Sequence, residues 1–93
     1  MISSTKKSFR RRFKQLPPEI QELARKNFKL WLRDSQHPYL HFKKVGKFWS
    51  VRIGLNYRAL ATVIGERVDW FWISPHDEYE RLITRVQGTD ATL

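Results

Sequence analysis

Arg52 and His76 have side chains whose chemistry suits work on a phosphodiester bond. An arginine is permanently charged and donates paired N–H groups to phosphate oxygens. A histidine gains and loses a proton near neutral pH. Metal-free cleavage of RNA needs both abilities, because the 2′-OH must lose a proton, the phosphorane must be stabilised and the 5′ oxygen must be protonated. Tyr79, three residues after His76, could donate a proton or stack on a base.

Each of these residues also has an ordinary structural interpretation. Arg52 shares a face of an expected strand with Ser50, opposite Trp49 and Val51, and could simply face solvent. His76 could help to cap the last expected helix, and Tyr79 fits the apolar stripe of that helix better than a catalytic role. Acidic neighbours could orient the histidine, but they would also repel RNA phosphates. These neighbours are Asp77, Glu78 and Glu80.

The chain is strongly basic, with 18 Lys and Arg against nine Asp and Glu and a net charge of +9. Such an excess usually persists because the partner is polyanionic. We expect a middle-loop cluster to contact phosphate, with a solvated loop as the alternative. It consists of Lys43, Lys44 and Lys47. A second cluster would position the domain on RNA without taking part in chemistry. It consists of Arg10, Arg11 and Arg12, followed by Lys14.

Several classes of site are excluded or not expected. The chain has no cysteine, which excludes disulfides and thiolate metal ligands. His37 and His41 have no acidic pattern around them and are interpreted as loop residues, so we expect no metal and no cofactor. No stretch has the length of a membrane-spanning helix. The first seven residues lack the apolar run of a signal peptide, so we expect a reduced, cytoplasmic location.

The 93 residues suit one domain. We expect a flexible basic arm over 1–7, a folded domain over 8–86 and a disordered tail over 87–93. Phe9 and Phe13 could share one face of a short strand over 8–14. Leu16-Pro17-Pro18-Glu19 indicates the start of an amphipathic helix that ends near Arg33, with a break that could divide it into a helical hairpin. The segment 39–47 is expected to be a loop.

Three strands should follow this loop. They are predicted over 48–55, 58–64 and 67–74, with a turn at 54–57 and a tight hairpin at Gly65-Glu66. In the last strand we expect Val68, Trp70 and Trp72 on one face, with Phe71 and Ile73 on the other. Ser74-Pro75 then opens a short C-terminal helix. The predicted fold class is α+β: an antiparallel-rich four-stranded sheet with the N-terminal helix or helical hairpin on one face.

This layout resembles the RelE/ParE superfamily of toxins, over most of the chain from Phe9 to Ile83. Four segments carry the resemblance together, in this order and spacing. They are Leu16-Pro17-Pro18-Glu19-Ile20, the run from Pro38 to Lys44, Trp49-Ser50-Val51-Arg52-Ile53 with Asn56-Tyr57-Arg58-Ala59-Leu60, and the run from Trp70 to Tyr79. Arg52 matches the strand arginine that RelE-like and YoeB-like nucleases place at the scissile phosphate, and His76 matches the terminal histidine of YoeB-like members. Tyr57 and Arg58 are interpreted as residues that close the hairpin.

The resemblance implies the toxin of a type II toxin–antitoxin pair. It favours an enzyme, a ribosome-dependent mRNA endoribonuclease that inhibits translation. The alternatives are a ParE-type inhibitor of DNA gyrase, which the acidic last helix would suit, and a catalytically degenerate member that binds RNA or a partner. The implied partners are the ribosome, mRNA and an acidic antitoxin that is partly disordered alone. Through that antitoxin the complex could bind operator DNA.

Overall fold

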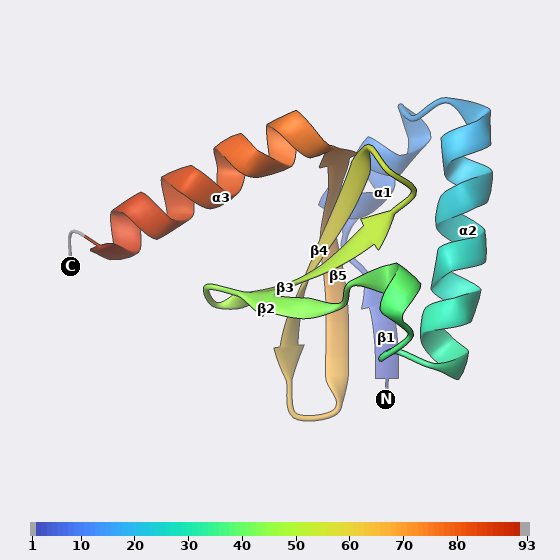
Figure 1. Ribbon diagram of the computed structural model, residues 1–93, viewed down its shortest axis with the longest axis horizontal. Coiled ribbons are helices and arrows are strands. Elements are labelled where there is room, and N and C mark those ends of the chain that lie inside the picture. Colours follow the sequence, from blue (N-terminus) through green and yellow to red (C-terminus); the bar gives the residue numbers. More distant parts are fainter. Residues whose placement is uncertain (1, 92–93) are drawn as a thin grey trace.

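The computed structural model describes residues 2–91, and their side chains as far as residue 85, as a small α+β domain. A central sheet has α2 against one face, while α3 leaves from the other face (Figure 1). The elements in chain order are β1 (Ile2–Thr5), α1 (Lys7–Lys14), α2 (Pro18–Arg33), a 3-10 turn (Pro38–Leu40), β2 (Lys43–Val45), β3 (Phe48–Ile53), β4 (Tyr57–Ile64), β5 (Arg67–Pro75) and α3 (His76–Ala91).

The sheet has five strands in the order β1-β5-β4-β3-β2. The four strands β2 to β5 are antiparallel to their sheet neighbours, and β1 is parallel to β5, so the sheet is mixed. The prediction of four strands is wrong in number and in composition. The predicted strand over 8–14 is absent, whereas β2 forms within the predicted loop over 39–47 and β1 forms within the predicted arm.

β1 forms because its side chains, as well as its backbone, bind β5. Ser4 Oγ donates a short hydrogen bond to Asp69 Oδ1, and Trp70 Nε1 donates to Ser3 Oγ at 3.1 Å. The flexible arm predicted over 1–7 is therefore wrong for residues 2–5. Serines near a chain end suggest an arm because the partners that order them stand more than 60 positions later in the sequence.

The buried Asp69 should make the attachment of β1 sensitive to acid. Hydrogen bonds from Ser4 and from Arg67, whose Nε lies 3.0 Å from both carboxylate oxygens, hold the pKa of Asp69 below its usual value. A lowered folded-state pKa gives stability that is complete above the ordinary aspartate pKa of about 3.9 and is lost as the pH falls through the lower, folded value.

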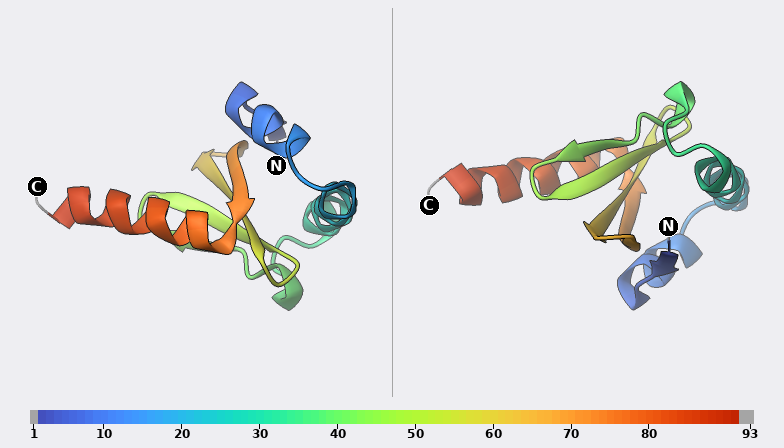
Figure 2. Two further views of the ribbon diagram at one scale, coloured as in Figure 1. Left: turned by 90° about the horizontal axis from the view of Figure 1, so that it is seen from above. Right: turned by 90° about the horizontal axis from the view of Figure 1, so that it is seen from below.

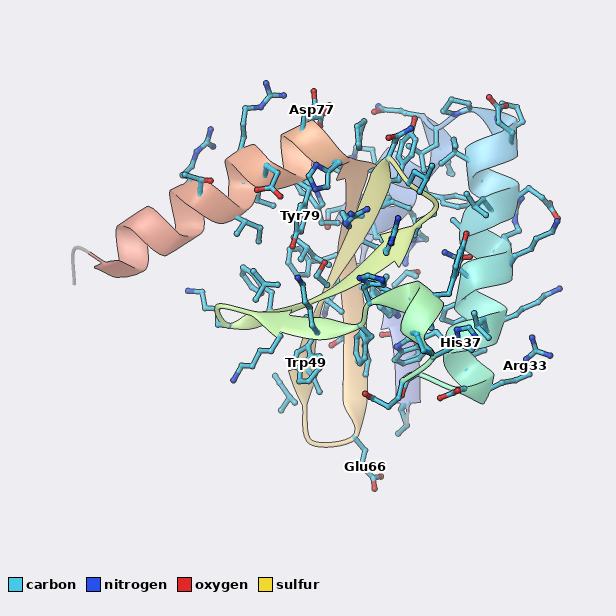
Figure 3. All side chains as sticks on the ribbon, viewed as in Figure 1. Arg33, His37, Trp49, Glu66, Asp77 and Tyr79 are labelled. Atoms are coloured by element: carbon cyan, nitrogen blue, oxygen red, sulfur yellow. The ribbon has the colours of Figure 1, made fainter. Side chains whose placement is uncertain are left out.

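Asp69→Asn should therefore lower the thermal midpoint by several degrees at pH 7, and the gap to the wild type should close in acid. Melting curves between pH 7 and pH 2 measure this difference. Glu66→Gln is the matched control, because Glu66 is an exposed carboxylate at the tip of the β4–β5 hairpin (Figure 3). A gap between wild type and Asp69→Asn that stays constant down to pH 2 would contradict the assignment.

Residues 7–14 form helix α1 and not the predicted strand. Phe9 and Phe13 are four positions apart, a spacing that places them on one face of a strand and also on one face of a helix. Their rings stack with centroids 6.1 Å apart, and both pack against the main core. The four-residue spacing of the two phenylalanines fits both periods, so the choice depends on tertiary packing that a short segment does not reveal.

The predicted helix from Pro18 to Arg33 is confirmed as α2. Its Trp31 is 3% exposed and meets Phe42 and Trp70 edge-on, with centroids 5.6 Å and 5.4 Å away. These aromatic rings join α2 to the sheet in the main core. The other buried members of this core are Ala24, Leu40, Val51, Ile53, Ala59, Ala61, Val68 and Ile73.

A bulge in β5 changes which of its residues share a face. Leu60 pairs with Trp72 and Ala61 pairs with Trp70, so Phe71 is the extra residue on β5. Val68, Trp70 and Ile73 consequently lie in the main core beneath α2, while Phe71 and Trp72 pack in a second cluster on the α3 side. The strict alternation predicted for this strand is wrong from Trp72 onward, because the bulge shifts the phase by one residue.

The C-terminal helix α3 is longer than predicted. It is traced from His76 to Ala91 and projects away from the sheet (Figure 1). Tyr79 and Ile83 are buried with Leu60 in the second cluster, which attaches the first two turns of the helix to the sheet. The predicted disordered tail over 87–93 is wrong for residues 87–91, which belong to α3, while residues 92–93 lie outside the described residues. Within the described part of the chain, no helix is both long and apolar enough to cross a bilayer.

Candidate functional site

Two arginines stand opposite each other on neighbouring strands. Arg52 of β3 pairs with Arg58 of β4 in the antiparallel register. Directly paired residues point to the same side of a sheet. Val51 and Ile53, the neighbours of Arg52 on β3, belong to the core beneath α2, so both guanidinium groups lie on the α3 side. We call Arg52 and Arg58 the arginine pair.

The turn between β3 and β4 holds both side chains in place. Arg52 donates from Nε to the carbonyl of Gly54 at 3.0 Å, and Arg58 donates from Nη1 to the carbonyl of Tyr57 at 2.8 Å. Gly54 has a φ of +62°, and a Cβ there would lie 2.6 Å from Leu23 Cδ2 of α2. Glycine therefore allows the turn to sit tightly against α2, which fixes the backbone that positions the arginine pair.

His41 contacts the arginine pair from the segment before β2. Its Nε2 lies 3.3 Å from Arg52 Nη1. A guanidinium group cannot accept a hydrogen bond, so Arg52 donates and the imidazole accepts. An imidazole that accepts a hydrogen bond at Nε2 carries its proton on Nδ1. His41 also has a left-handed backbone, with a φ of 47°, which turns the chain into β2.

Arg58 is partly buried beside the like charge of Arg52. Partial burial lowers its pKa from the ordinary arginine value, and the adjacent charge of Arg52 lowers the pKa further. Coulombic interactions with Tyr79 and Glu80 raise the pKa of Arg58 instead. Arg58 remains charged, but it shares a confined space with a like charge. Such a place would favour an anion that both guanidinium groups can bind.

The start of α3 brings His76 to the same end of the sheet. Its backbone N–H donates to the carbonyl of Asn56, in the β3–β4 turn, at 2.7 Å. The His76 side chain is 45% exposed, and its Nε2 lies 3.2 Å from Glu80 Oε1. A carboxylate at this distance fixes the ring orientation and leaves Nδ1 as the nitrogen that can exchange a proton with a ligand.

Tyr79 differs from the other predicted catalytic residues because it is buried, with 6% of its surface exposed. It points from α3 toward the sheet (Figure 3), packs with Leu60 and Ile83, and has its ring centroid 5.9 Å from that of His76. A buried ring cannot stack on a base, so Tyr79 takes the core position that its place in the apolar stripe favoured. Its place beside Arg58 and His76 suits a positioning residue.

The acidic residues of α3 do not face the site together. Asp77 is exposed and points away from the sheet (Figure 3). Glu78 Oε2 lies 3.3 Å from Arg12 Nη1 of α1, which neutralises its charge. Glu80 is the member of this group that contacts His76. The repulsion of RNA phosphates expected from the acidic group is therefore weaker than the sequence indicates.

The predicted phosphate-binding lysines are divided between the two sides of the sheet. Lys43 pairs with Ser50 and shares the side of the arginine pair, whereas Lys44 pairs with Trp49 and lies on the α2 side. Lys47 is exposed in the β2–β3 turn, with its Nζ 6.0 Å from the ring centroid of Phe48. Of the three, Lys43 is the one whose strand position adds to the charge around the arginine pair.

The predicted basic group on α1 also separates. Arg12 lies over the ring of Trp72 at 3.5 Å and binds Glu78, so it joins α1 to α3. Arg10 donates to the carbonyl of Thr5 at 2.6 Å and remains exposed, as does Arg11. The packing of Arg12 argues against its predicted role at RNA, since its guanidinium plane is already covered by an indole ring.

Arg58 and His41 were missed by the sequence interpretation, which treated one as a hairpin residue and the other as a loop residue. Arg52 and Arg58 stand opposite each other because the observed pairing is centred on Leu55, with Ile53 opposite Tyr57. The predicted turn over 54–57 is centred between Leu55 and Asn56, a register that would set Arg52 opposite Ala59, so it did not identify Arg58. No signal in the sequence identifies His41, because its position depends on an irregular segment.

In the described part of the chain, no three His, Asp or Glu side chains gather closely enough to hold a metal ion.

Comparisons with known proteins show the fold. No family model matches the sequence, and no curated protein matches it significantly. Two solved structures match the fold of this chain. One is the RelBE2 toxin–antitoxin complex from Mycobacterium tuberculosis, with a TM-score of 0.62 and 20% identity over 80% of this chain and 95% of the other. The second is the RelB–RelE antitoxin–toxin complex from Methanococcus jannaschii, with a TM-score of 0.61 and 21% identity over 88% of this chain and 98% of the other. The chain thus has the fold of a chain found in RelBE toxin–antitoxin complexes.

Proposed function

We propose that this protein is the toxin of a toxin–antitoxin pair and that it cleaves mRNA on the ribosome without a metal ion. The observation that carries this proposal is the arginine pair, with His76 at the same end of the sheet. The fold shared with chains of RelBE complexes supports it. The net charge of +9 favours the toxin over the antitoxin, because a protein that covers a basic surface is expected to be acidic.

The chemistry assigns a separate task to each group. Arg52 and Arg58 bind the scissile phosphate and stabilise the charge that develops on the phosphorane. Nδ1 of His76 exchanges the proton with the reacting oxygens, while Glu80 holds the ring. Lys43 binds a neighbouring phosphate of the same strand. Attack by the 2′-OH leaves a cyclic phosphate on one product and a 5′-OH on the other.

The test uses purified full-length protein, ribosomes programmed with a defined mRNA, and mapping of the 5′ ends of the products. We expect cuts within the ribosomal A-site codon that carry a 5′-OH end, and little cutting of the same mRNA without ribosomes. Arg52→Ala should reduce cutting at least about tenfold, which separates the protein's own activity from a contaminating nuclease. Intact mRNA on ribosomes under these conditions would refute the proposal.

A gyrase inhibitor is the second candidate, and the acidic first turn of α3 is the observation that favours it. Supercoiling by purified gyrase in the presence of the protein distinguishes the two functions. Inhibition of supercoiling, together with intact mRNA on ribosomes, would establish this alternative. If neither assay responds but RNA of mixed sequence is still bound, the chain is a binding member of the fold without catalysis.

The proposed partner is an acidic antitoxin that is partly disordered alone and folds on the α3 side of the sheet. Burial of the arginine pair under such a partner would block access to the phosphate. Binding of operator DNA by the complex would then depend on the antitoxin. Co-expression with the product of a neighbouring short acidic reading frame, followed by size-exclusion chromatography, tests the pairing.

A further inference from the structure

A second concave site lies on the opposite side of the sheet from the arginine pair. It is a cavity of about 490 Å³ between α1, α2 and the sheet, here called the α1–α2 cavity. Aromatic rings form much of its wall, and they are those of Phe9, Phe13, Phe28, Trp31 and Trp70. Its volume falls within the roughly 300–1,000 Å³ that is typical of small-molecule sites.

The cavity exists because α1 and α2 meet only near their connection. Gln21 of α2 donates to the carbonyls of Phe13 and Leu16 at 3.2 Å and 3.1 Å, which holds the end of α1 against the start of α2. Beyond this point the two helices diverge and do not pair along their lengths (Figure 2). The face of α2 that contains Ala24 and Phe28 is therefore only partly covered by α1.

The charged side chains of the wall are all positive. Arg10, Lys14 and Arg25 belong to the lining, all three are exposed, and none of the residues that line the cavity is acidic. Arg25 lies over the ring of Phe13 at 5.2 Å, so its charge stays beside the apolar interior. Its ion pair with Glu22, at 3.9 Å, joins two exposed side chains and is easily exchanged for another anion.

One polar atom of the wall also lacks a partner. Trp31 is 3% exposed and lines the cavity, and its indole Nε1–H is buried without a hydrogen bond. Buried donors without an acceptor are uncommon in native proteins, because the lost hydration is not replaced. Because this atom is itself covered by its neighbours, it adds no exposed polar group to the apolar wall.

We propose that the α1–α2 cavity binds a small amphipathic monocarboxylate, of the class of medium-chain fatty acids. The aromatic wall would cover the hydrocarbon body, and Arg10, Lys14 and Arg25 would hold the carboxylate at the entrance. This site is separate from the arginine pair. Asn27 of α2, which lines the cavity, donates to the carbonyl of Arg52 at 2.9 Å, so the two sites share one strand.

The test titrates the full chain with decanoate, below the concentration at which micelles form, and follows tryptophan fluorescence and calorimetric heat. Trp31 and Trp70 line the cavity, so we expect a saturable change with one site per chain. Decyltrimethylammonium has the same chain length and the opposite charge, and it should bind at least about tenfold more weakly. Equal binding of both probes, or no saturable change, would overturn the proposal.

Two variants locate the binding. Lys14→Gln combined with Arg25→Gln removes two entrance charges and should weaken decanoate binding about tenfold, whereas Lys26→Gln, exposed on α2 outside the lining, should leave it unchanged. Ala24→Leu places extra side-chain volume in the cavity and should also weaken binding. Because the charge variants alter exposed residues only, they decide the question even if Ala24→Leu fails to fold. Undiminished binding in the double charge variant would refute the site.

Discussion

Replacing Arg58 with alanine should lower the rate of mRNA cleavage about 100- to 1,000-fold, which is the usual loss when one preorganised donor to a developing oxyanion is removed. Arg58 is already held by its hydrogen bond to the carbonyl of Tyr57, and the neighbouring Tyr79 and Glu80 favour its charged form. It therefore requires little reorganisation to reach the phosphorane. This preorganisation is the physical reason for the large expected effect.

The same substitution should hardly change the stability of the fold. Arg52 and Arg58 occupy directly opposed positions on β3 and β4, where like charges repel. Removing one of them relieves that repulsion and loses some packing, so the free energy of unfolding should change by less than about 1 kcal/mol. A residue that costs stability but supports activity is typical of a functional site.

Cleavage rates on programmed ribosomes and urea unfolding curves measure the two effects in parallel. Arg33→Ala is the matched control, because Arg33 is an exposed arginine at the end of α2, remote from α3 (Figure 3). Arg58→Lys should recover part of the rate, since an ammonium group keeps the charge but cannot form the paired hydrogen bonds. A rate for Arg58→Ala within about threefold of the wild type, or an equal loss in Arg33→Ala, would exclude a role at the phosphate.

The two arginines should also act as a unit. If both bind one phosphate, the Arg52→Ala, Arg58→Ala double variant should lose much less than the product of the two single losses, because either single change already breaks the shared clamp. Independent, multiplicative losses would indicate two separate phosphate contacts along the strand. The register of β3 and β4 favours the shared contact.

Sequence patterns predicted the parts of this fold whose signals are local. The helix from Pro18 to Arg33 has a proline start and a continuous apolar stripe, and the Gly65-Glu66 hairpin has a glycine with a φ of +58°. The prediction is wrong where contacts between residues distant in the sequence decide which element forms. β1 depends on Asp69 and Trp70, and α1 has an aromatic spacing that fits two periods. A bulge at Phe71 also has no local signature.

In the candidate site, too, local patterns could be predicted and contacts between distant residues could not. The strand face of Arg52 could be predicted, because alternation with Trp49 and Val51 sets it, and both residues lie on the opposite side of β3. The opposition of Arg52 and Arg58 required the hairpin register, which is a property of two strands together. His41 and Glu80 complete the surroundings of Arg52 and His76 through contacts that neither strand nor helix periodicity encodes.

His76→Ala should lower cleavage about 100- to 10,000-fold, the range expected for loss of a positioned general acid or base. The pH–rate profile should lose the limb that His76 supplies, a change that a structural role would not produce. Glu80→Gln keeps the shape of the partner but removes its charge, and it should reduce the rate less than His76→Ala does because Glu80 orients the ring without reacting.

Asp77→Ala is the control for these α3 variants, because Asp77 stands next to His76 yet points into solvent, away from the sheet (Figure 3). Its rate and its pH profile should match the wild type. If His76→Ala retains the full profile, the proton must move through another group near the arginine pair. His41 is then the candidate, since its Nε2 already lies 3.3 Å from Arg52 Nη1. Loss of the profile in His41→Ala but not in His76→Ala would transfer the acid–base role from α3 to the segment before β2.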